Sequence, residues 1–344
     1  MDESGGRSGV IAGGNWIVDR VRIIDAYPEQ DGLAHILGQS VSNGGSPYNL
    51  LKDLARLEAP FPLAGAGLTG ADEEGRFILE DCRAHGIDVS RLRTTAAAAT
   101  AYTDVMTVKS TGRRTFFYQA GTNGLLDHDD LAPNGSNARI FHLGYLLLLD
   151  RLDEIGPDGQ TGAARLLRTA QSLGFRTSAD VVSEDSGRVR AVVDPCLPAI
   201  DYFFLNEREA ERITGTSTRR NESVDWDGVS DAAKVLIDRG VNEVVCVHCP
   251  EGALARTISG REHRQASVDL PPENIAGAVG AGDAFAAGVL LGLHEGWQLE
   301  RSLQLGVCAA ASSLLHPASS TGVLPWKECL KLGEVFGFRE SGVR

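Results

Sequence analysis

The sequence predicts an α/β fold: a Rossmann-like, mostly parallel sheet covered by helices on both faces, with a small separate β-sheet. Apolar strand candidates alternate with amphipathic helix candidates from about residue 62 onward, and this rhythm is typical of a parallel sheet that is buried on both faces. Four strand candidates of mixed polarity lie apart from it, at 21–27, 33–42, 101–108 and 114–118. Mixed polarity suits a separate, exposed sheet.

The strand candidates of the main sheet are short apolar segments. The first covers Val10–Val18, and the others lie at 62–68, 139–149, 175–182, 202–205 and 243–247. Apolar residues recur at helical spacing in the helix candidates at 48–57, 72–85, 162–173, 207–214, 231–239, 284–295, 299–315 and 326–336. The polar residues 1–9 are expected to be a flexible tail. One folded domain is expected over 10–340, with the strands of the small sheet inserted within about 20–43 and 100–120.

The composition excludes several classes of function. The 344-residue chain has a formal net charge of −13, and an acidic surface repels nucleic acids and anionic membranes, so neither is an expected partner. No apolar run approaches the roughly 18 residues of a membrane-spanning helix. The N-terminus lacks the apolar core of a signal peptide. The six cysteines are scattered through apolar stretches, which indicates reduced thiols in a cytoplasmic protein.

The strongest candidate site is the stretch Gly277-Ala-Val-Gly-Ala-Gly-Asp-Ala-Phe285. Its small residues Gly280, Ala281 and Gly282 let backbone N–H groups approach a ligand, and a helix N-terminus that follows such a turn binds anions. Asp283 could accept a proton from an alcohol while the amides stabilise a phosphoryl group. Aspartate is also a favoured helix cap, so both interpretations stay open on this stretch alone.

Other nucleotide-binding patterns fit this stretch less well. In a dinucleotide fingerprint the third glycine would stand where Phe285 stands, and the motif would follow the first strand. This disfavours a nicotinamide-dependent oxidoreductase. No G-x-x-x-x-G-K-[ST] string occurs, which excludes a P-loop.

Two further motifs carry groups suited to a polyol ligand. Gly44 and Gly45 permit close approach of the backbone, and Asn49 offers a donor and an acceptor. The same segment could be an ordinary loop in which Pro47 starts a helix. Asp19, after the first strand candidate, could accept two sugar hydroxyls or simply start a turn.

Asn206-Glu-Arg-Glu209 follows a strand candidate and opens a helix candidate. Hard oxygen ligands one turn apart suit Mg²⁺ held largely through water, but the same spacing also makes an ordinary capping box. Cys246-Val-His-Cys249 resembles half a metal site. No second C-x-x-C exists, and residues three apart on a strand point to opposite faces, so both cysteines are interpreted as buried strand residues.

Taken in order, these motifs resemble the ribokinase-like (PfkB) family of carbohydrate kinases over roughly residues 10–325. The resemblance rests on Gly14-x-x-x-x-Asp19, Gly44-Gly45-x-x-x-Asn49, Asn206-x-x-Glu209 and Gly280-Ala-Gly-Asp283. It implies a ribokinase-like fold and transfer of the γ-phosphoryl group of ATP to a hydroxyl of a sugar or nucleoside. It also implies a lid that closes over this acceptor and often pairs between subunits, hence a homodimer.

The resemblance assigns roles to the matching residues. Asp283 would be the general base, and the amides of Gly280, Ala281 and Gly282 would form the anion hole. The acceptor would bind at Asp19, Gly44, Gly45 and Asn49; Mg²⁺ and the triphosphate would be organised by Asn206 and Glu209; and the nucleotide would contact Asn206, His248, Gly252, Gly280 and Gly282.

The chain departs from the family pattern at several positions. Gly277 and Ala278 stand where the family usually has Asp-Thr. In the family, this Asp-Thr pair helps to hold a monovalent cation beside the anion hole. The loop from His248 to Gly252 lacks the family's first glycine and is one residue shorter. Ser46 stands where ribose kinases often carry a lysine, so a ribose-specific assignment has little support. A catalytically impaired member that binds a sugar or nucleoside is therefore the alternative.

Overall fold

A nine-stranded sheet forms the centre of the computed structural model, which describes residues 6–184, 186–221, 223–316 and 320–340. The strand order is β15-β14-β13-β10-β9-β8-β1-β4-β5, and the strands from β13 to β5 are parallel. Their bounds are β1 (Val10–Gly14), β4 (Leu63–Gly70), β5 (Asp88–Thr95), β8 (Ile140–Leu146), β9 (Arg176–Val181), β10 (Tyr202–Asn206), β13 (Val244–Cys249), β14 (Gly252–Thr257) and β15 (Glu262–Ala266).

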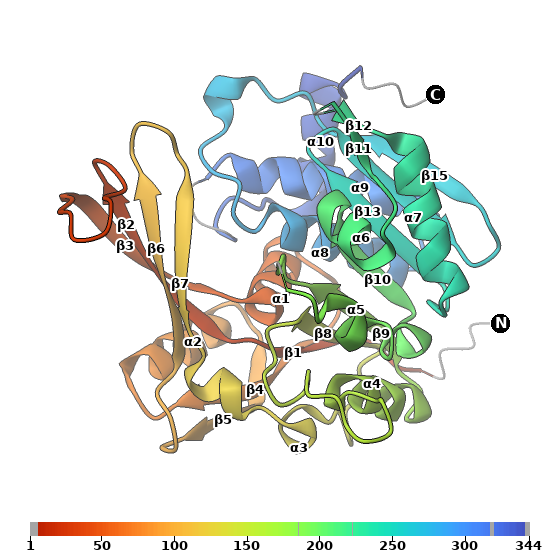
Figure 1. The fold of residues 1–344 in the computed structure, drawn as a ribbon. Coiled ribbons are helices and arrows are strands. Elements are labelled where there is room, and N and C mark those ends of the chain that lie inside the picture. Colours follow the sequence, from red (N-terminus) through yellow and green to blue (C-terminus); the bar gives the residue numbers. More distant parts are fainter. Residues whose placement is uncertain (1–5, 185, 222, 317–319, 341–344) are drawn as a thin grey trace.

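Helices cover both faces of this sheet and enclose two hydrophobic cores (Figure 1). One core packs against α1 (Ser46–Arg56), α2 (Glu73–Ala84), α8 (Ala281–His294), α9 (Leu299–Leu314) and α10 (Trp326–Phe336); the other packs against α3 (His128–Leu131), α4 (Gly162–Ser172), α5 (Val189–Val193), α6 (Glu207–Thr214) and α7 (Trp226–Asp238). Successive residues of a strand point to opposite faces. In β10, Phe203 and Leu205 accordingly enter one core and Tyr202 and Phe204 the other. The predicted fold class is confirmed.

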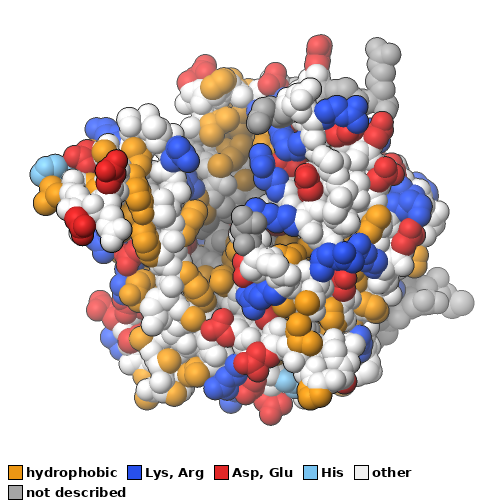
Figure 2. Space-filling model, in the orientation of Figure 1, with side chains coloured by type: hydrophobic (Ala, Val, Ile, Leu, Met, Phe, Trp, Pro, Cys, Tyr) orange, Lys and Arg blue, Asp and Glu red, His pale blue; other side chains and the backbone are white. Residues whose placement is uncertain are grey.

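A second sheet of four strands forms the lid, as the sequence predicts. Its order is β3 (Ile36–Gly44), β2 (Ile17–Ile24), β6 (Ala101–Val108) and β7 (Arg114–Gln119). Figure 1 shows the lid standing away from the main sheet. In the space-filling view of Figure 2, a hollow separates it from the C-terminal half of the molecule. The remaining short elements are β11 (Arg219–Arg220), β12 (Ser223–Val224), η1 (Gly121–Leu125), η2 (Leu197–Ala199) and η3 (Pro272–Asn274).

The prediction of one strand over Val10–Val18 is wrong. β1 ends at Gly14, whose φ of 134° suits only glycine, and a Cβ atom there would lie 2.4 Å from the carbonyl oxygen of Gly144. The chain then leaves the main sheet and enters the lid as β2. Asp19 therefore lies inside a lid strand, not just past the end of the first strand.

Three strands of the main sheet and the start of helix α7 were not predicted, and neither were the short elements α3, α5, β11 and β12. Most side chains of β5 are exposed or half-buried, and β14 and β15 form an antiparallel hairpin at the sheet edge. None of these carries the continuous apolar run of a buried parallel strand. Helix α7 begins five positions before the predicted start, because Asp225 caps it by accepting from the Gly228 N–H group.

Part of the predicted N-terminal tail is anchored to the folded body. The Arg7 guanidinium donates to the carbonyl oxygens of Ser136, Ala138 and Leu173 and lies 4.3 Å from the centre of the Phe175 ring. Residues 1–5 of that tail lie outside the described residues. None of the helices in the described ranges is long and apolar enough to cross a membrane.

Candidate active site

The predicted anion-binding turn lies at the start of α8. Gly280 is the N-cap residue, with φ of 78°, and no side chain of the described residues caps the helix. The amides of Ala281, Gly282 and Asp283 belong to the first turn, where a helix provides no internal acceptors. Asp283 is the third residue of α8 and not its cap. The structure therefore shows an open, positively polarised helix end.

Asp283 is a buried carboxyl group with a raised pKa. The Asn49 side chain donates from Nδ2 to Oδ2 of Asp283 at 2.8 Å, and the Tyr145 hydroxyl lies 3.3 Å from the same oxygen. Burial, followed by the charge of Asp180, raises the pKa of Asp283 to about 8. A carboxylate with a raised pKa is a stronger proton acceptor than an exposed one.

The two glycines before α1 make room for neighbouring groups. A Cβ atom on Gly44 would lie 2.2 Å from Oδ2 of Asp19, and one on Gly45, whose φ is 91°, would lie 1.9 Å from the Asn15 carbonyl oxygen. Burial raises the pKa of Asp19 to about 6, against a hydrogen bond from Thr103 that lowers it. The motifs from β2 and from the start of α1 therefore meet.

Asn49 contacts Asp283 in this structure. Its Nδ2 donates to Asp283, and its Oδ1 accepts from the Ser320 hydroxyl at 3.1 Å. The structure thus joins two residues that the sequence singles out separately.

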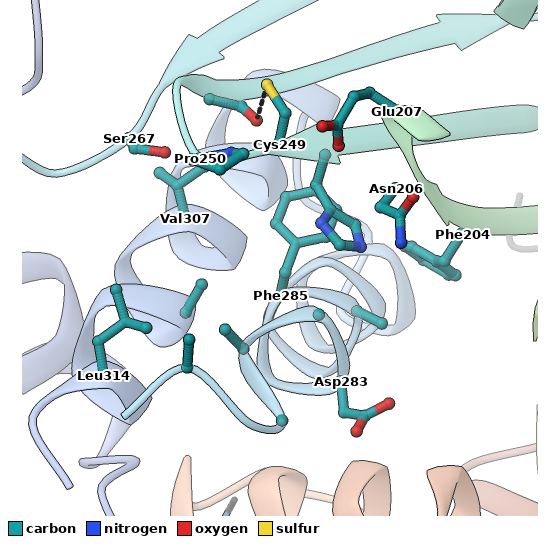
Figure 3. Close-up of a pocket in the computed structure, with 18 of the residues that line it drawn as sticks. Phe204, Asn206, Glu207, Cys249, Pro250, Ser267, Asp283, Phe285, Val307 and Leu314 are labelled. Carbon is teal, nitrogen blue, oxygen red and sulfur yellow. Dashed lines mark hydrogen bonds between the residues drawn. The ribbon is translucent and has the colours of Figure 1, made fainter. Parts of the chain in front are cut away.

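A cavity of about 610 Å³ extends from Asp283 between β10, β13 and α9. In Figure 3, Asn206 and Asp283 lie on one side of this cavity and Val307 and Leu314 on the other. The predicted nucleotide contacts Asn206, His248, Gly252, Gly280 and Gly282 all line it, together with the apolar residues Val268, Leu270, Val307 and Leu314. One end can accept a charged group and the other an apolar ring.

The His248 ring packs against the glycine turn and the first residues of α8. Its ring centre lies 5.3 Å from that of Phe285, and its Cε1 lies 3.0 Å from the place of a Cβ atom on Gly282. Burial lowers the pKa of His248 to about 4, so the ring is neutral at neutral pH. A side chain at position 282 would therefore press against the His248 ring on β13.

Asn206 and Glu209 form the capping box that the sequence left as one of two interpretations. Asn206 Oδ1 accepts from the Glu209 N–H group at 2.9 Å, and Glu209 Oε2 accepts from the Asn206 N–H group at 2.8 Å. The Ser183 hydroxyl donates to the other carboxylate oxygen of Glu209, and burial raises the pKa of Glu209 to about 7. No group of three His, Cys, Asp or Glu side chains among the described residues is placed to hold a metal ion. A magnesium role for the pair stays a prediction.

Sequence reasoning missed Tyr145 and Asp180. Both line the cavity, and Tyr145 contacts Asp283. The segment from Tyr145 to Leu149 shows only an apolar run. The available signal was polar residues within apolar strand candidates. Asp180 lies within the predicted strand 175–182, and His142 and Ser178 are polar register partners on β8 and β9. All six cysteines are free thiols; Cys246 is buried, and Cys249 lines the cavity.

Comparison with known proteins gives a consistent result. The family model described as pfkB family carbohydrate kinase matches residues 15–327. An ATP-dependent ribose-1-phosphate kinase from Halopiger xanaduensis is 27% identical over 302 residues, which cover 87% of this chain and 89% of that protein.

Two solved structures share the fold. Arabidopsis thaliana ribokinase complexed with ribose and ATP aligns with a TM-score of 0.74 at 21% identity, over 95% of this chain and 98% of that one. A putative ribokinase II from E. coli in complex with ATP and Mg²⁺ aligns with a TM-score of 0.75 at 17% identity, over 95% of this chain and 99% of that one.

Proposed function

The chain belongs to the pfkB family of carbohydrate kinases, and on that premise we propose that it transfers the γ-phosphoryl group of ATP to a hydroxyl of a sugar or nucleoside. The observation that carries this proposal is a buried carboxylate, Asp283, in the first turn of a helix whose N-terminus is open. A proton acceptor and a phosphate-binding site then lie within one helical turn.

Asp283 would accept the proton of the attacking hydroxyl. The amides of Gly280, Ala281 and Gly282 would stabilise the charge on the transferred phosphoryl group. Phosphoryl transfer depends mainly on positioning and on charge neutralisation, and both groups are fixed by the backbone of α8. The raised pKa of Asp283 favours proton transfer near neutral pH.

The residues that line the cavity suit a nucleoside triphosphate. Its apolar wall of Val268, Leu270, Val307 and Leu314 suits an aromatic base, and its opposite end reaches the amides of α8. Asn206 and Glu209 offer the oxygen ligands that Mg²⁺ prefers, and they would hold it through its waters because their own oxygens already accept hydrogen bonds. When bound, Mg²⁺ would neutralise phosphate charge.

The acceptor would bind between the lid and α1, at Asp19, Gly44, Gly45 and Asn49. Asp19 can accept two hydroxyl hydrogens, and Gly44 leaves space beside it. Closure of the lid would exclude the water that competes as an acceptor.

The alternative is a member of the family that binds a sugar or nucleoside but turns over poorly. Gly277 and Ala278, in place of the family's Asp-Thr, favour it. Thermal-shift assays with ATP–Mg²⁺ and with sugars or nucleosides, each alone, would separate the two functions. A binder without catalysis would be stabilised by its acceptor alone, whereas a kinase would also respond to ATP–Mg²⁺.

The first experiment is an ATP-consumption screen over sugars, sugar phosphates and nucleosides, followed by Asp283→Asn with the best acceptor. This substitution keeps the shape of the side chain and removes the base, so we expect kcat to fall by about 10²–10⁴ with little change in stability. Asp158→Asn, which removes an exposed carboxylate, is the matched control. Wild-type turnover in the Asp283 variant would disprove the assigned role.

A further inference from the structure

The two oxygens of the Asp283 carboxylate are not equivalent. Oδ2 receives the Asn49 amide at 2.8 Å and lies 3.3 Å from the Tyr145 hydroxyl. Among the described residues, the one hydroxyl or amide donor near Oδ1 is the same Tyr145 hydroxyl, at 3.5 Å. Since a phenol has one hydrogen, it can donate fully to only one of them. Oδ2 is therefore anchored, and Oδ1 keeps lone pairs available.

Tyr145 reaches Asp283 from an unusual backbone conformation. Its φ is 55°, in the left-handed region that a bulky residue rarely adopts. Its N–H group donates to Oδ1 of Asp180 at 2.6 Å. The preceding residue, Gly144, leaves space for Ser46, whose Oγ would lie 2.4 Å from a Cβ atom there. Burial, then the charge of Asp283, raises the pKa of Tyr145, so its hydroxyl stays protonated and can donate.

Asp180 also holds the start of α1. The Ser46 hydroxyl donates to Oδ2 of Asp180 at 2.6 Å and lies 3.1 Å from Nε2 of His142. The ring of His142 is completely buried, and its Nδ1 lies 2.9 Å from the Ser178 hydroxyl. Ser46 is the first residue of α1, and Asn49 follows within the same turn. One carboxylate on β9 therefore fixes both elements that bring donors to Asp283.

We propose that Tyr145 and Asp180 are positioning residues for the catalytic base. Asp180 fixes Tyr145 and the first turn of α1, and the two donors on these elements hold Oδ2 of Asp283 so that Oδ1 faces the acceptor hydroxyl. This inference rests on the proposed kinase function. Positioning of this kind matters because small displacements of a general base reduce the rate strongly.

Several charged groups set the proton affinity of Asp283. Burial raises its pKa most, and the charges of Asp180 on β9 and Glu209 on α6 raise it further. Asp53 on α1 couples to it electrostatically, while hydrogen bonds from Asn49 and Tyr145 lower it. Removing the Tyr145 hydroxyl should therefore raise this pKa, and neutralising Asp180 should lower it.

The test is the pH profile of kcat/KM for the best acceptor. On the acidic side of this profile, kcat/KM rises with pH as the base loses its proton. The position of this acidic limb reports the pKa of the base in the free enzyme. For Tyr145→Phe we expect kcat to fall on the order of tenfold and the limb to move to higher pH. For Asp180→Asn we expect a lower kcat and a limb that moves to lower pH. Structural damage alone would not produce opposite displacements.

The matched control is Tyr202→Phe. It removes another buried tyrosine hydroxyl beside a carboxylate, that of Glu243, at the opposite end of β10 from Asn206, and should leave the limb in place. Ser46→Ala removes the hydrogen bond between the start of α1 and Asp180. This variant should lower kcat more than it changes KM for the acceptor.

Two outcomes would overturn the inference. One is a Tyr145→Phe profile that superimposes on the wild type. The other is an Asp180→Asn variant that raises only KM for ATP–Mg²⁺, because the carboxylate would then serve the nucleotide. Failure of the kinase function itself looks different, since Asp283→Asn would then keep its turnover or no acceptor would be phosphorylated.

Discussion

Several acidic side chains around this site are buried and have raised pKa values. Burial raises the pKa of Asp19, Asp53, Glu209 and Asp283, which come from four different elements. In the proposed reaction the raised pKa suits Asp283 to its role, because a stronger base accepts a proton more readily. Asp53 has no such role in the proposed reaction. It is completely buried on α1, and no hydrogen bond reaches its carboxyl oxygens from the part of the chain that the structure describes.

We predict that Asp53→Asn stabilises the protein increasingly as pH rises. Burial, then the charge of Asp283, raises the folded-state pKa of Asp53 well above its unfolded value. The unfolded chain therefore releases this proton first, and stability falls as pH rises from the unfolded pKa toward the folded one. Asparagine does not titrate. The expected gain is small near pH 4 and grows steadily as the pH is raised toward 8.

Thermal or urea unfolding of both proteins at pH 5 and pH 8 measures this effect. Asp231→Asn, at an exposed position of α7, is the control. Ser320 lies beside Asp53, but its hydroxyl donates to Asn49. A less stable Asp53→Asn variant at pH 8 would show that the carboxylate is ionised and has a partner, such as a bound cation.

At the scale of an element, the turn before α8 is held by the protein backbone. The Ala276 N–H group donates to the Leu314 carbonyl oxygen at the end of α9, at 2.8 Å. Gly277 and Ala278 supply neither the charge nor the hydroxyl that the family's Asp-Thr would bring to a monovalent cation. Carbonyl oxygens carry only partial charge, so a cation site built from them alone should be weak.

We therefore predict that turnover is nearly insensitive to replacing K⁺ with a bulky organic cation at fixed ionic strength. A titration of initial rate against K⁺ tests it. The competing expectation is that a nearby carboxylate such as Glu273, which is exposed in η3, reaches in and restores the site. Several-fold activation by K⁺, lost in Glu273→Gln, would establish that alternative and contradict the prediction.

At the scale of the whole molecule, the lid exposes large hydrophobic side chains and open sheet edges that a second subunit could bury. Hydrophobic side chains form a band on the lid in Figure 2, and Ile23, Val41, Phe116 and Phe117 are 40%, 59%, 60% and 50% exposed. β3 and β7 are sheet edges. Large exposed apolar groups and open edges typically mark an interface. We predict a homodimer that forms through the lid.

Light scattering at micromolar concentration should give the mass of a dimer. Phe116 and Phe117 point to opposite faces of β7, so Phe116→Glu and Phe117→Glu would identify the buried face by which of them yields a monomer. Val335→Glu, at a position 72% exposed on α10, is the control. A wild-type monomer would contradict the prediction, and loss of the dimer in the control would point to an interface elsewhere.

Local sequence patterns determined the fold class, the four lid strands and the glycine turn that opens α8. Each depends on neighbours in the chain: the period of apolar residues in α9 and α10, mixed polarity in β2 and β3, and the small residues before Asp283. Such signals are written in the sequence because hydrogen bonding and burial within one element repeat with a fixed period. They do not show the break after Gly14, where the chain approaches Gly144, a residue far away in the sequence.

The tertiary structure decided how the site is assembled. Asn49 and Asp283 are 234 residues apart in the sequence, and Ser46 and Asp180 are 134 apart, yet each pair shares a hydrogen bond. Tyr145 stands in a leucine-rich run that showed no polar role, and its hydroxyl reaches Asp283 from a residue with left-handed backbone. No local period specifies such pairs, because they form only when the strands of a parallel sheet bring their carboxyl ends to one edge.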